Sequence, residues 1–200
     1  MKLIFATGNA AKIREAREIL GNEVEVLSPW GAGLRLGDAY IEETGATFKE
    51  NSLLKAEHLH KVTGRPCFAD DSGLEVDALG GAPGIYSARY ASLAGGNDHD
   101  FESNIDRLLR ELQGVEDRRA RFRCVTTLIM DGEPVFFEGT CEGRIGYERS
   151  GSRGFGYDPV FIPDAFPDHS LAELTDDVKN AISHRGEALR KMAAFLSEQL

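Results

Sequence analysis

The stretch KLIFATGNAAK, residues 2–12, sets the expected fold at the start of the chain. Residues 2–6 form an apolar run, which is typical of a buried strand. A helix is predicted to begin at Asn9 or Ala10, because apolar residues then recur at helical spacing until Gly21. The chain therefore opens with a strand that turns directly into a helix.

The turn between this strand and this helix has the properties of an anion-binding turn. Gly8 allows the backbone to come close to a ligand, and the helix start offers unpaired N–H groups at the positive end of its dipole. Lys12 adds a mobile positive charge one turn into the helix. The pattern favours a phosphate site, although ordinary strand-to-helix connections share it and the Walker A pattern is absent.

Composition narrows the classes of ligand. The 200 residues carry a formal net charge of −10, with 42% hydrophobic and 28% charged residues, which is typical of a soluble globular protein. An acidic chain of this kind is a poor general binder of nucleic acid or of anionic membrane. A phosphate ligand would therefore need a local basic pocket or a metal ion.

Cysteine usage and targeting signals indicate the compartment. The 3 cysteines (Cys67, Cys124 and Cys141) are far apart and form no metal-binding or disulfide pattern, so we expect reduced, buried thiols. No signal peptide is recognised, and no apolar run reaches the ~20 residues that a membrane span needs. We expect a cytoplasmic protein.

The order of predicted elements favours an α/β domain with a mixed sheet. Helices and strands alternate in the first half of the chain, and the second half is rich in strands. Helices are predicted over residues 48–62, 99–113 and at the C-terminal end, and strands over residues 24–27, 67–69, 74–76, 121–130, 134–138, 141–148 and 159–162. Irregular, Gly-rich segments are predicted over residues 31–46, 80–90 and 150–157.

Two acidic segments are candidates for a metal site. Residues 70–73 (Asp-Asp-Ser-Gly) are expected at the end of a strand, where α/β proteins place ligands, and Glu42-Glu43 lies in an irregular segment. Carboxylates at such a place suit Mg²⁺, which takes one or two of them together with waters and substrate phosphates. A turn with solvated acids is the alternative, since Asp, Ser and Gly are common turn residues.

Two further segments are candidates for binding a flat base. Residues 155–159 (Phe-Gly-Tyr-Asp-Pro) could stack on a base and bond to its edge, or their aromatic rings could simply cap the core. Lys179 precedes residues 183–186 (Ser-His-Arg-Gly) at the expected start of the last helix. The guanidinium of Arg185 only donates hydrogen bonds, so it would favour a 6-oxo purine over adenine; solvated charges at a helix end are the alternative.

In this order, the motifs resemble the inosine triphosphate pyrophosphatase family, and most of all its bacterial XTP/dITP diphosphatase branch. The resemblance covers nearly the whole chain. It rests on residues 7–12, 42–45, 50–56, 70–73, 80–90, 155–159 and 183–186. It implies one domain over residues 1–200, with a long curved mixed sheet, flanking helices and two lobes around a central active-site cleft. It also implies a homodimer that uses Mg²⁺ to convert ITP, dITP or XTP to the monophosphate and pyrophosphate.

The resemblance assigns roles to individual residues. The triphosphate would be held by Thr7, Gly8, Asn9, Lys12 and Lys55. Glu42 and Asp71 would hold the metal, with Glu43 as the alternative acid and Glu15 assisting nearby. Asp71 would also be the catalytic proton acceptor, Lys12 would act in catalysis by neutralising charge, and Ser72 would touch the substrate. The nucleoside end would be bound by Phe155, Gly156, Tyr157, Asp158, Lys179, His184 and Arg185.

The expected reaction is attack of water on the α-phosphorus, with pyrophosphate as the leaving group. Two other functions compete with it. A pyrophosphatase for modified pyrimidine triphosphates, of the septum-inhibitor type, is disfavoured by residues 155–158 and 183–185. A nucleotide sensor without turnover is disfavoured because two acidic segments would repel a triphosphate in the absence of a metal.

Overall fold

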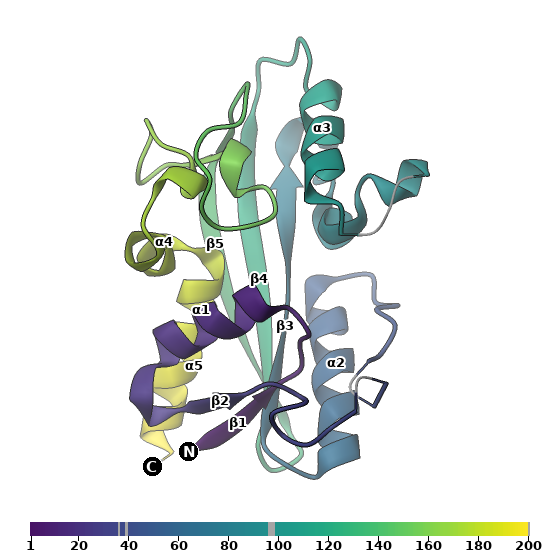
Figure 1. Cartoon of the computed structure of the whole chain (residues 1–200), viewed down its shortest axis with the longest axis vertical. Helices are drawn as coiled ribbons and strands as arrows, with labels where there is room; N and C mark the ends of the chain where they lie inside the picture. The colour runs from purple at the N-terminus through teal and green to yellow at the C-terminus, as the bar shows by residue number, and fades with distance from the viewer. Residues whose placement is uncertain (36, 39, 96–98, 200) are drawn as a thin grey trace. The chain divides into compact units, whose positions relative to one another are not determined.

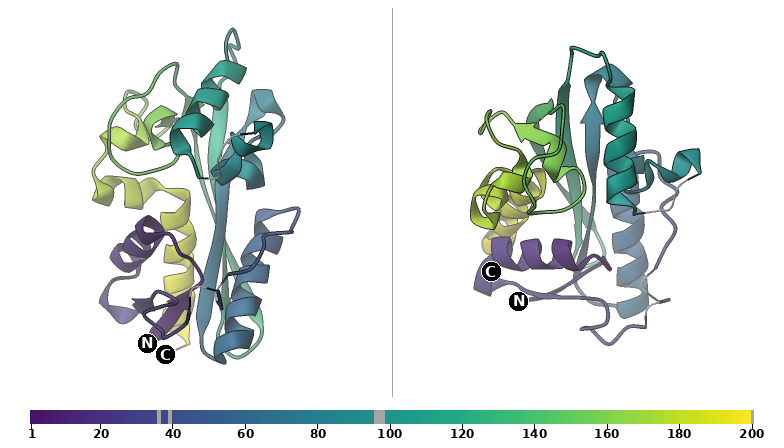
Figure 2. Two further views of the ribbon diagram at one scale, coloured as in Figure 1. Left: turned by 45° about the vertical axis from the view of Figure 1, so that its right-hand side comes forward. Right: turned by 45° about the horizontal axis from the view of Figure 1, so that its top comes forward.

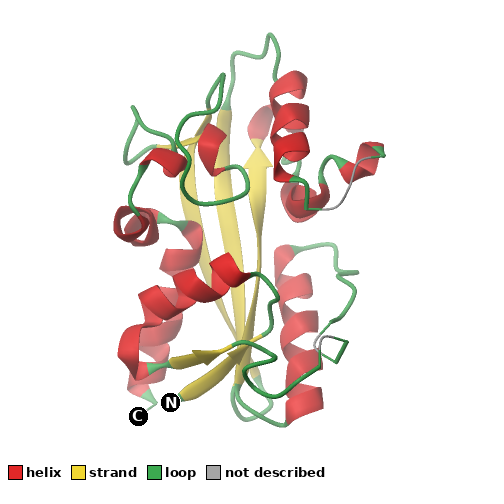
Figure 3. Ribbon diagram, in the orientation of Figure 1, coloured by secondary structure: helices red, strands yellow, loops and turns green. Residues whose placement is uncertain are grey.

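The computed structural model describes residues 1–35, 37–38, 40–95 and 99–199. Six strands form one sheet in the order β2-β1-β3-β4-β5-β6 (Figures 1 and 3). The strands are β1 (Lys2–Phe5), β2 (Glu25–Leu27), β3 (Cys67–Val76), β4 (Arg119–Ile129), β5 (Pro134–Ile145) and β6 (Phe161–Pro163). β1 runs parallel to both β2 and β3, whereas β5 and β6 are antiparallel, so the predicted mixed α/β sheet is confirmed.

Helices precede, connect and follow these strands. The α-helices are α1 (Ala10–Leu20), α2 (Phe48–Thr63), α3 (Phe101–Glu111), α4 (Asp176–Ile182) and α5 (His184–Glu198). Short 3₁₀ helices are η1 (Gly21–Glu23), η2 (Asp77–Leu79), η3 (Gly84–Arg89), η4 (Ser92–Ala94), η5 (Asp158–Val160) and η6 (Leu171–Glu173). None of the described helices is both long enough and apolar enough to cross a membrane.

The chain divides into two compact units. The first unit comprises residues 1–71, 124–139 and 184–200, and the second comprises residues 72–123 and 140–183. The single domain over residues 1–200 remains a prediction.

In the first unit, the alternation of side chains along β1 builds a core on both faces of the sheet. Leu3 and Phe5 pack into a cluster with apolar residues of α1 and α5. Ile4 belongs to a second cluster, which includes apolar residues of α2. Successive side chains of a strand point to opposite faces, so one short strand supports helices on both. Figure 2 shows α1 beside α5, consistent with their contacts.

Local capping fixes where α2 begins and ends. The Thr47 hydroxyl accepts from the Glu50 N–H at 3.1 Å, as the sequence pattern predicts, and the Glu50 carboxylate reaches back to the N–H of Ala46 at 2.7 Å. Gly64, with φ of 63°, ends the helix in the left-handed conformation. This is close to the helix expected over residues 48–62.

The second unit has one core of its own. Apolar side chains of α3, including Ile105 and Leu108, pack against the later part of β3 and against Phe122 of β4. Tyr157 and Phe161 complete this cluster from the segment that leads into β6.

One expectation about this sheet is wrong and matters for the site. Residues 70–73 were expected where a strand ends, with a turn as the alternative, but they lie inside β3, which runs unbroken from Cys67 to Val76. Turn propensity is overridden because the Asp70 carboxylate is neutralised within the fold by Lys12 and Arg185.

The remaining differences concern the ends of individual strands and one helix that was not predicted. The strands expected over residues 134–138 and 141–148 are one strand, β5, and α4 was not foreseen. The strand expected over residues 159–162 begins only at Phe161, after η5. Residues 36 and 39, within the segment expected to be irregular, lie outside the described residues; the described part of residues 31–46 forms turns and irregular backbone.

A substitution at Gly139 tests the packing of β5 against α5. A β-carbon at this position would stand 2.0 Å from the His184 carbonyl oxygen and 2.7 Å from the Ala188 nitrogen. Gly139→Ala should lower the free energy of unfolding by about 2 kcal/mol or more, because backbone atoms would have to move apart. Urea denaturation measures the effect. Gly37→Ala is the control, since a β-carbon there meets no atom of the described residues within 4 Å. An equal loss of stability in both variants would contradict the packing.

Candidate active site

The turn after β1 is held by its own side chains. The Asn9 N–H donates to the Thr7 hydroxyl at 3.2 Å, and the Asn9 side-chain oxygen accepts from the N–H groups of Ala11 at 2.9 Å and Lys12 at 3.3 Å. Asn9 is therefore the N-cap of α1 and satisfies two helix N–H groups that were expected to face a phosphate. A methyl group added at Gly8 would stand 3.9 Å from the indole of Trp30, so the turn has an aromatic neighbour.

A chain of alternating charges runs inward from this turn. The Lys12 ammonium contacts one Asp70 carboxylate oxygen at 2.8 Å, and Arg185 Nε contacts the other at 2.8 Å. Arg185 Nη1 contacts the Glu15 carboxylate at 2.5 Å. Three elements, α1, β3 and α5, thus meet through ion pairs in which only Lys12 has more than marginal exposure.

These ion pairs fix the charge state of Asp70. Burial alone would raise the pKa of its carboxyl group, but the neighbouring charges of Lys12 and Arg185 hold that pKa well below its usual range. The same two carboxylates, of Asp70 and Glu15, raise the pKa of the buried Arg185 guanidinium. Glu15, expected near a metal, is therefore brought to Arg185, and Arg185, expected at the base, holds two carboxylates.

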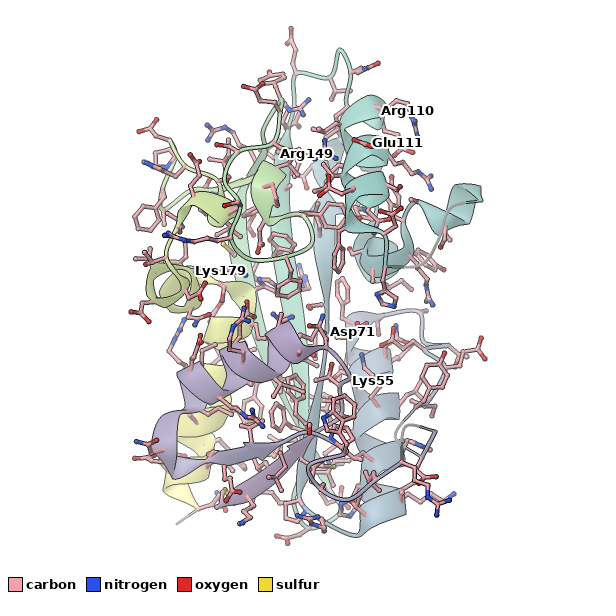
Figure 4. The ribbon with its side chains drawn as sticks, viewed as in Figure 1. Lys55, Asp71, Arg110, Glu111, Arg149 and Lys179 are labelled. Carbon is pink, nitrogen blue, oxygen red and sulfur yellow. The ribbon has the colours of Figure 1, made fainter. Side chains whose placement is uncertain are left out.

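A second charged group lies around Lys55 of α2. Its ammonium is paired with Glu43 and lies 3.7 Å from an Asp71 carboxylate oxygen. Figure 4 marks Lys55 and Asp71 on α2 and β3. The side chain of Glu42 is exposed, and no hydrogen bond or ion pair links it to another described residue. The structure therefore brings the alternative acid, Glu43, to Lys55.

Asp71 differs electrostatically from Asp70, although the two are adjacent in β3. Burial and the nearby charge of Glu43 raise the pKa of Asp71 to about 6, and Lys55 opposes this only in part. In return, Asp71 and Glu43 raise the pKa of Lys55 in spite of its burial. A carboxylate that is disfavoured in its charged form can accept a proton near neutral pH or gain from a cation.

The donor set suits a hard divalent cation that also binds substrate. Among the described residues, no three acidic, histidine or cysteine side chains are arranged to enclose a metal ion by themselves. Asp71 and Glu43 are close enough for each charge to disfavour the other, and both are oxygen donors. One or two carboxylates completed by waters and phosphates is the usual arrangement for Mg²⁺, so these residues fit that ion.

The segment predicted to bind a base forms a buried group in the second unit. The Asp158 carboxylate accepts from the Lys179 ammonium at 2.8 Å and from the Phe155 N–H at 2.9 Å. The ammonium also lies 4.9 Å from the centre of the Phe155 ring. Gly154, with φ of 72°, must be glycine, because a β-carbon would stand 2.0 Å from the Asp158 carboxylate.

Tyr157 is placed differently from its neighbour Phe155. It is 4% exposed, belongs to the core of the second unit and donates its hydroxyl to the Ser87 carbonyl oxygen at 2.7 Å. Burial raises the pKa of its phenol. Its ring therefore supports the loop from within, which is the core-capping alternative considered for these aromatic residues.

The sequence-predicted site residues fall into two groups. The first unit contains Thr7, Gly8, Asn9, Lys12, Glu42, Lys55, Asp71, His184 and Arg185. The second unit contains Ser72, Phe155, Gly156, Tyr157, Asp158 and Lys179. Their roles remain predictions. Sequence reasoning assigned no role to Asp70 or Asn51, although both lie within the motifs named above. If the buried strand expected over residues 67–69 had been extended by one residue, it would have predicted a buried charge at Asp70.

The chain belongs to the Ham1 family. The family's sequence profile matches residues 3–195. A dITP/XTP pyrophosphatase of Methylococcus capsulatus is 50% identical over 98% of this chain and 96% of its own, and one of Christiangramia forsetii is 45% identical over 99% and 100%. The Ham1 protein of Staphylococcus aureus has a solved structure with a TM-score of 0.87 and 40% identity, covering 100% of both chains. The HAM1 protein of Coxiella burnetii gives 0.86 and 39%, covering 99% of both.

The two adjacent aspartates should respond oppositely to neutralisation. Asp70→Asn leaves Lys12 and Arg185 without their shared carboxylate, so it should lower the free energy of unfolding by about 3 kcal/mol or more. For Asp71, a pKa raised from 3.8 to about 6 means that stability is lost as pH rises through that window. Asp71→Asn should therefore raise metal-free stability at about pH 8, by up to about 2 kcal/mol.

Urea denaturation of both variants and the wild type in chelator, at about pH 4 and about pH 8, measures these effects. The gain in Asp71→Asn should vanish at the lower pH, where the wild-type side chain is protonated. Equal destabilisation by both substitutions at the higher pH would contradict the electrostatic difference between the two residues.

Proposed function

We propose that this protein hydrolyses ITP, dITP and XTP to the corresponding monophosphates and pyrophosphate. Its Ham1 membership and its relatives named dITP/XTP pyrophosphatases support this reaction. The single observation that carries it is the contrast between two adjacent aspartates of β3. Asp70 is neutralised by its partners and holds Lys12, whereas Asp71 lies at Lys55 and is disfavoured in its charged form. A site of this kind supplies both cations for phosphates and a base for water.

We propose Mg²⁺ as the cofactor, held by Asp71 together with one acid of the Glu42-Glu43 pair. Glu43 is favoured because it meets Lys55 and lies within electrostatic range of Asp71. When bound, the ion supplies neutralisation of phosphate charge and polarisation of the phosphorus–oxygen bonds.

The chain's own residues carry the remaining steps. Lys12 and Lys55 bind the phosphate oxygens and stabilise negative charge on the departing pyrophosphate. Asp71 accepts a proton from the water that attacks the α-phosphorus. Asp70 holds the Lys12 ammonium in place.

For the nucleoside end, the proposal uses the group around Lys179. Its ammonium only donates hydrogen bonds, so it suits the 6-oxo oxygen of hypoxanthine or xanthine and not the amino group of adenine. Phe155 offers a partly exposed ring beside that ammonium for stacking. Arg185 and His184 remain predicted readers of the base. A homodimer, which the family resemblance implies, and a location in the cytoplasm are part of the same proposal.

A nucleotide panel tests the proposed reaction. ITP, dITP and XTP should yield pyrophosphate with Mg²⁺ and not with chelator, whereas ATP and modified pyrimidine triphosphates should be poor substrates. Asp71→Asn should lower kcat by about a hundredfold or more, while nucleotide binding persists. Fluorescence of Trp30, the only tryptophan and a neighbour of Gly8, reports that binding. Binding without turnover in the wild type would instead identify a sensor.

The choice between the two adjacent acids is tested by a matched pair of variants. Glu43→Gln should raise the Mg²⁺ concentration for half-maximal activity by about tenfold or more, because it removes the carboxylate that faces Asp71. Glu42→Gln should change it by less than about threefold. Titration of activity with Mg²⁺ at saturating ITP measures both. The reverse order would assign the metal to Glu42, as the family resemblance implies.

A further inference from the structure

Asn51 is a buried polar residue to which the reaction above gives no role. It lies in the first turn of α2 and is 0% exposed. Its side-chain oxygen accepts from the Gly45 N–H at 2.8 Å. This bond fixes the end of the acidic segment that carries Glu42 and Glu43. Gly45 has no room for a side chain, since a β-carbon there would stand 2.7 Å from the same oxygen.

The Asn51 side chain also lies close to Asp71. It is near enough to favour the charged carboxylate, and so lowers the pKa of Asp71. Yet the Asn51 amide nitrogen has no acceptor at hydrogen-bonding distance among the described residues. A buried N–H without an acceptor costs about 1–3 kcal/mol, and a side chain kept at that cost calls for a functional reason.

We propose that Asn51 is a positioning residue that holds the acidic segment with its oxygen and orients the Asp71 carboxylate with its amide nitrogen. One planar amide then sets the separation between the acid at the Glu42-Glu43 pair and Asp71. Because the amide is planar and buried, the position of the acidic segment and the position of Asp71 are coupled through it. This proposal rests on the proposed function for the reaction and for the Mg²⁺ site through which it is tested.

The neighbouring Ser52 provides a matched structural control. It is equally buried, and its hydroxyl donates to the Ala69 carbonyl oxygen at 3.1 Å and lies 2.7 Å from the Thr127 hydroxyl. It therefore ties the same turn of α2 to β3 and β4 through bonds that involve neither Asp71 nor the acidic segment. Ser52→Ala removes a comparable buried bond and tests whether anchoring α2 is sufficient.

The test compares Asn51→Leu with Ser52→Ala. Leucine matches the shape of asparagine and removes both hydrogen-bonding ends. Asn51→Leu should lower kcat for ITP by about a hundredfold, because a small misplacement of the reacting group has an effect of that size, while KM stays within about threefold. The rise in melting temperature that Mg²⁺ produces should fall to less than about half of the wild-type value. Ser52→Ala should lower the melting temperature and leave both other quantities within about twofold.

Two outcomes overturn the proposal: Asn51→Leu with wild-type kcat and a wild-type response to Mg²⁺, or Ser52→Ala with losses equal to those of Asn51→Leu. Where Asn51→Leu does not fold, Asn51→Asp replaces it, since it keeps the acceptor for Gly45 and removes the amide donor that lies near Asp71. Wild-type kcat in that variant also overturns the proposal. A wild type that responds to Mg²⁺ but releases no pyrophosphate would refute the proposed function, and the melting comparison would still decide the role of Asn51.

Discussion

The structure of the site depends on the buried carboxylate of Asp70. Its two oxygens hold Lys12 of α1 and Arg185 of α5, and these partners lie 58 and 115 residues away in the sequence. A charge in the middle of a buried strand is tolerated only when opposite charges and hydrogen bonds surround it. These ion pairs therefore allow β3 to include an acidic segment, and they fix α1 and α5 against that strand.

The contrast between Asp70 and Asp71 explains how an acidic chain can hold a triphosphate. Overall charge is −10, which repels polyphosphate at long range. Within the site, Lys12 is held by Asp70, and Lys55 is held by Asp71 and Glu43. Both lysines are thus presented in place by carboxylates of the fold. The excess of negative charge at Asp71 and Glu43 is what a divalent cation would relieve.

Local signals in the sequence predicted the elements whose ends are capped by near neighbours. The helix after β1 and the helix that starts beyond Thr47 are such cases, because their caps lie within a few residues. The continuity of β3 could not be predicted this way, since Asp-Asp-Ser-Gly has the composition of a turn and the partners of Asp70 are distant. For the same reason, motif order indicated the acidic pair, but only coordinates distinguish exposed Glu42 from Glu43 at Lys55.

The shared carboxylate also constrains how the site can read its substrate. Arg185 was expected to meet the base directly. Yet the residue is only 2% exposed, and its guanidinium holds the carboxylates of Asp70 and Glu15. Because one carboxylate binds Lys12 and Arg185 together, a displacement of the arginine alters the electric field at Lys12, the lysine proposed to bind phosphate. Specificity for the base and efficiency at the phosphate are then not independent properties. A substitution at Arg185 acts on both through Asp70, and its effect on base preference can be interpreted only alongside its effect on kcat.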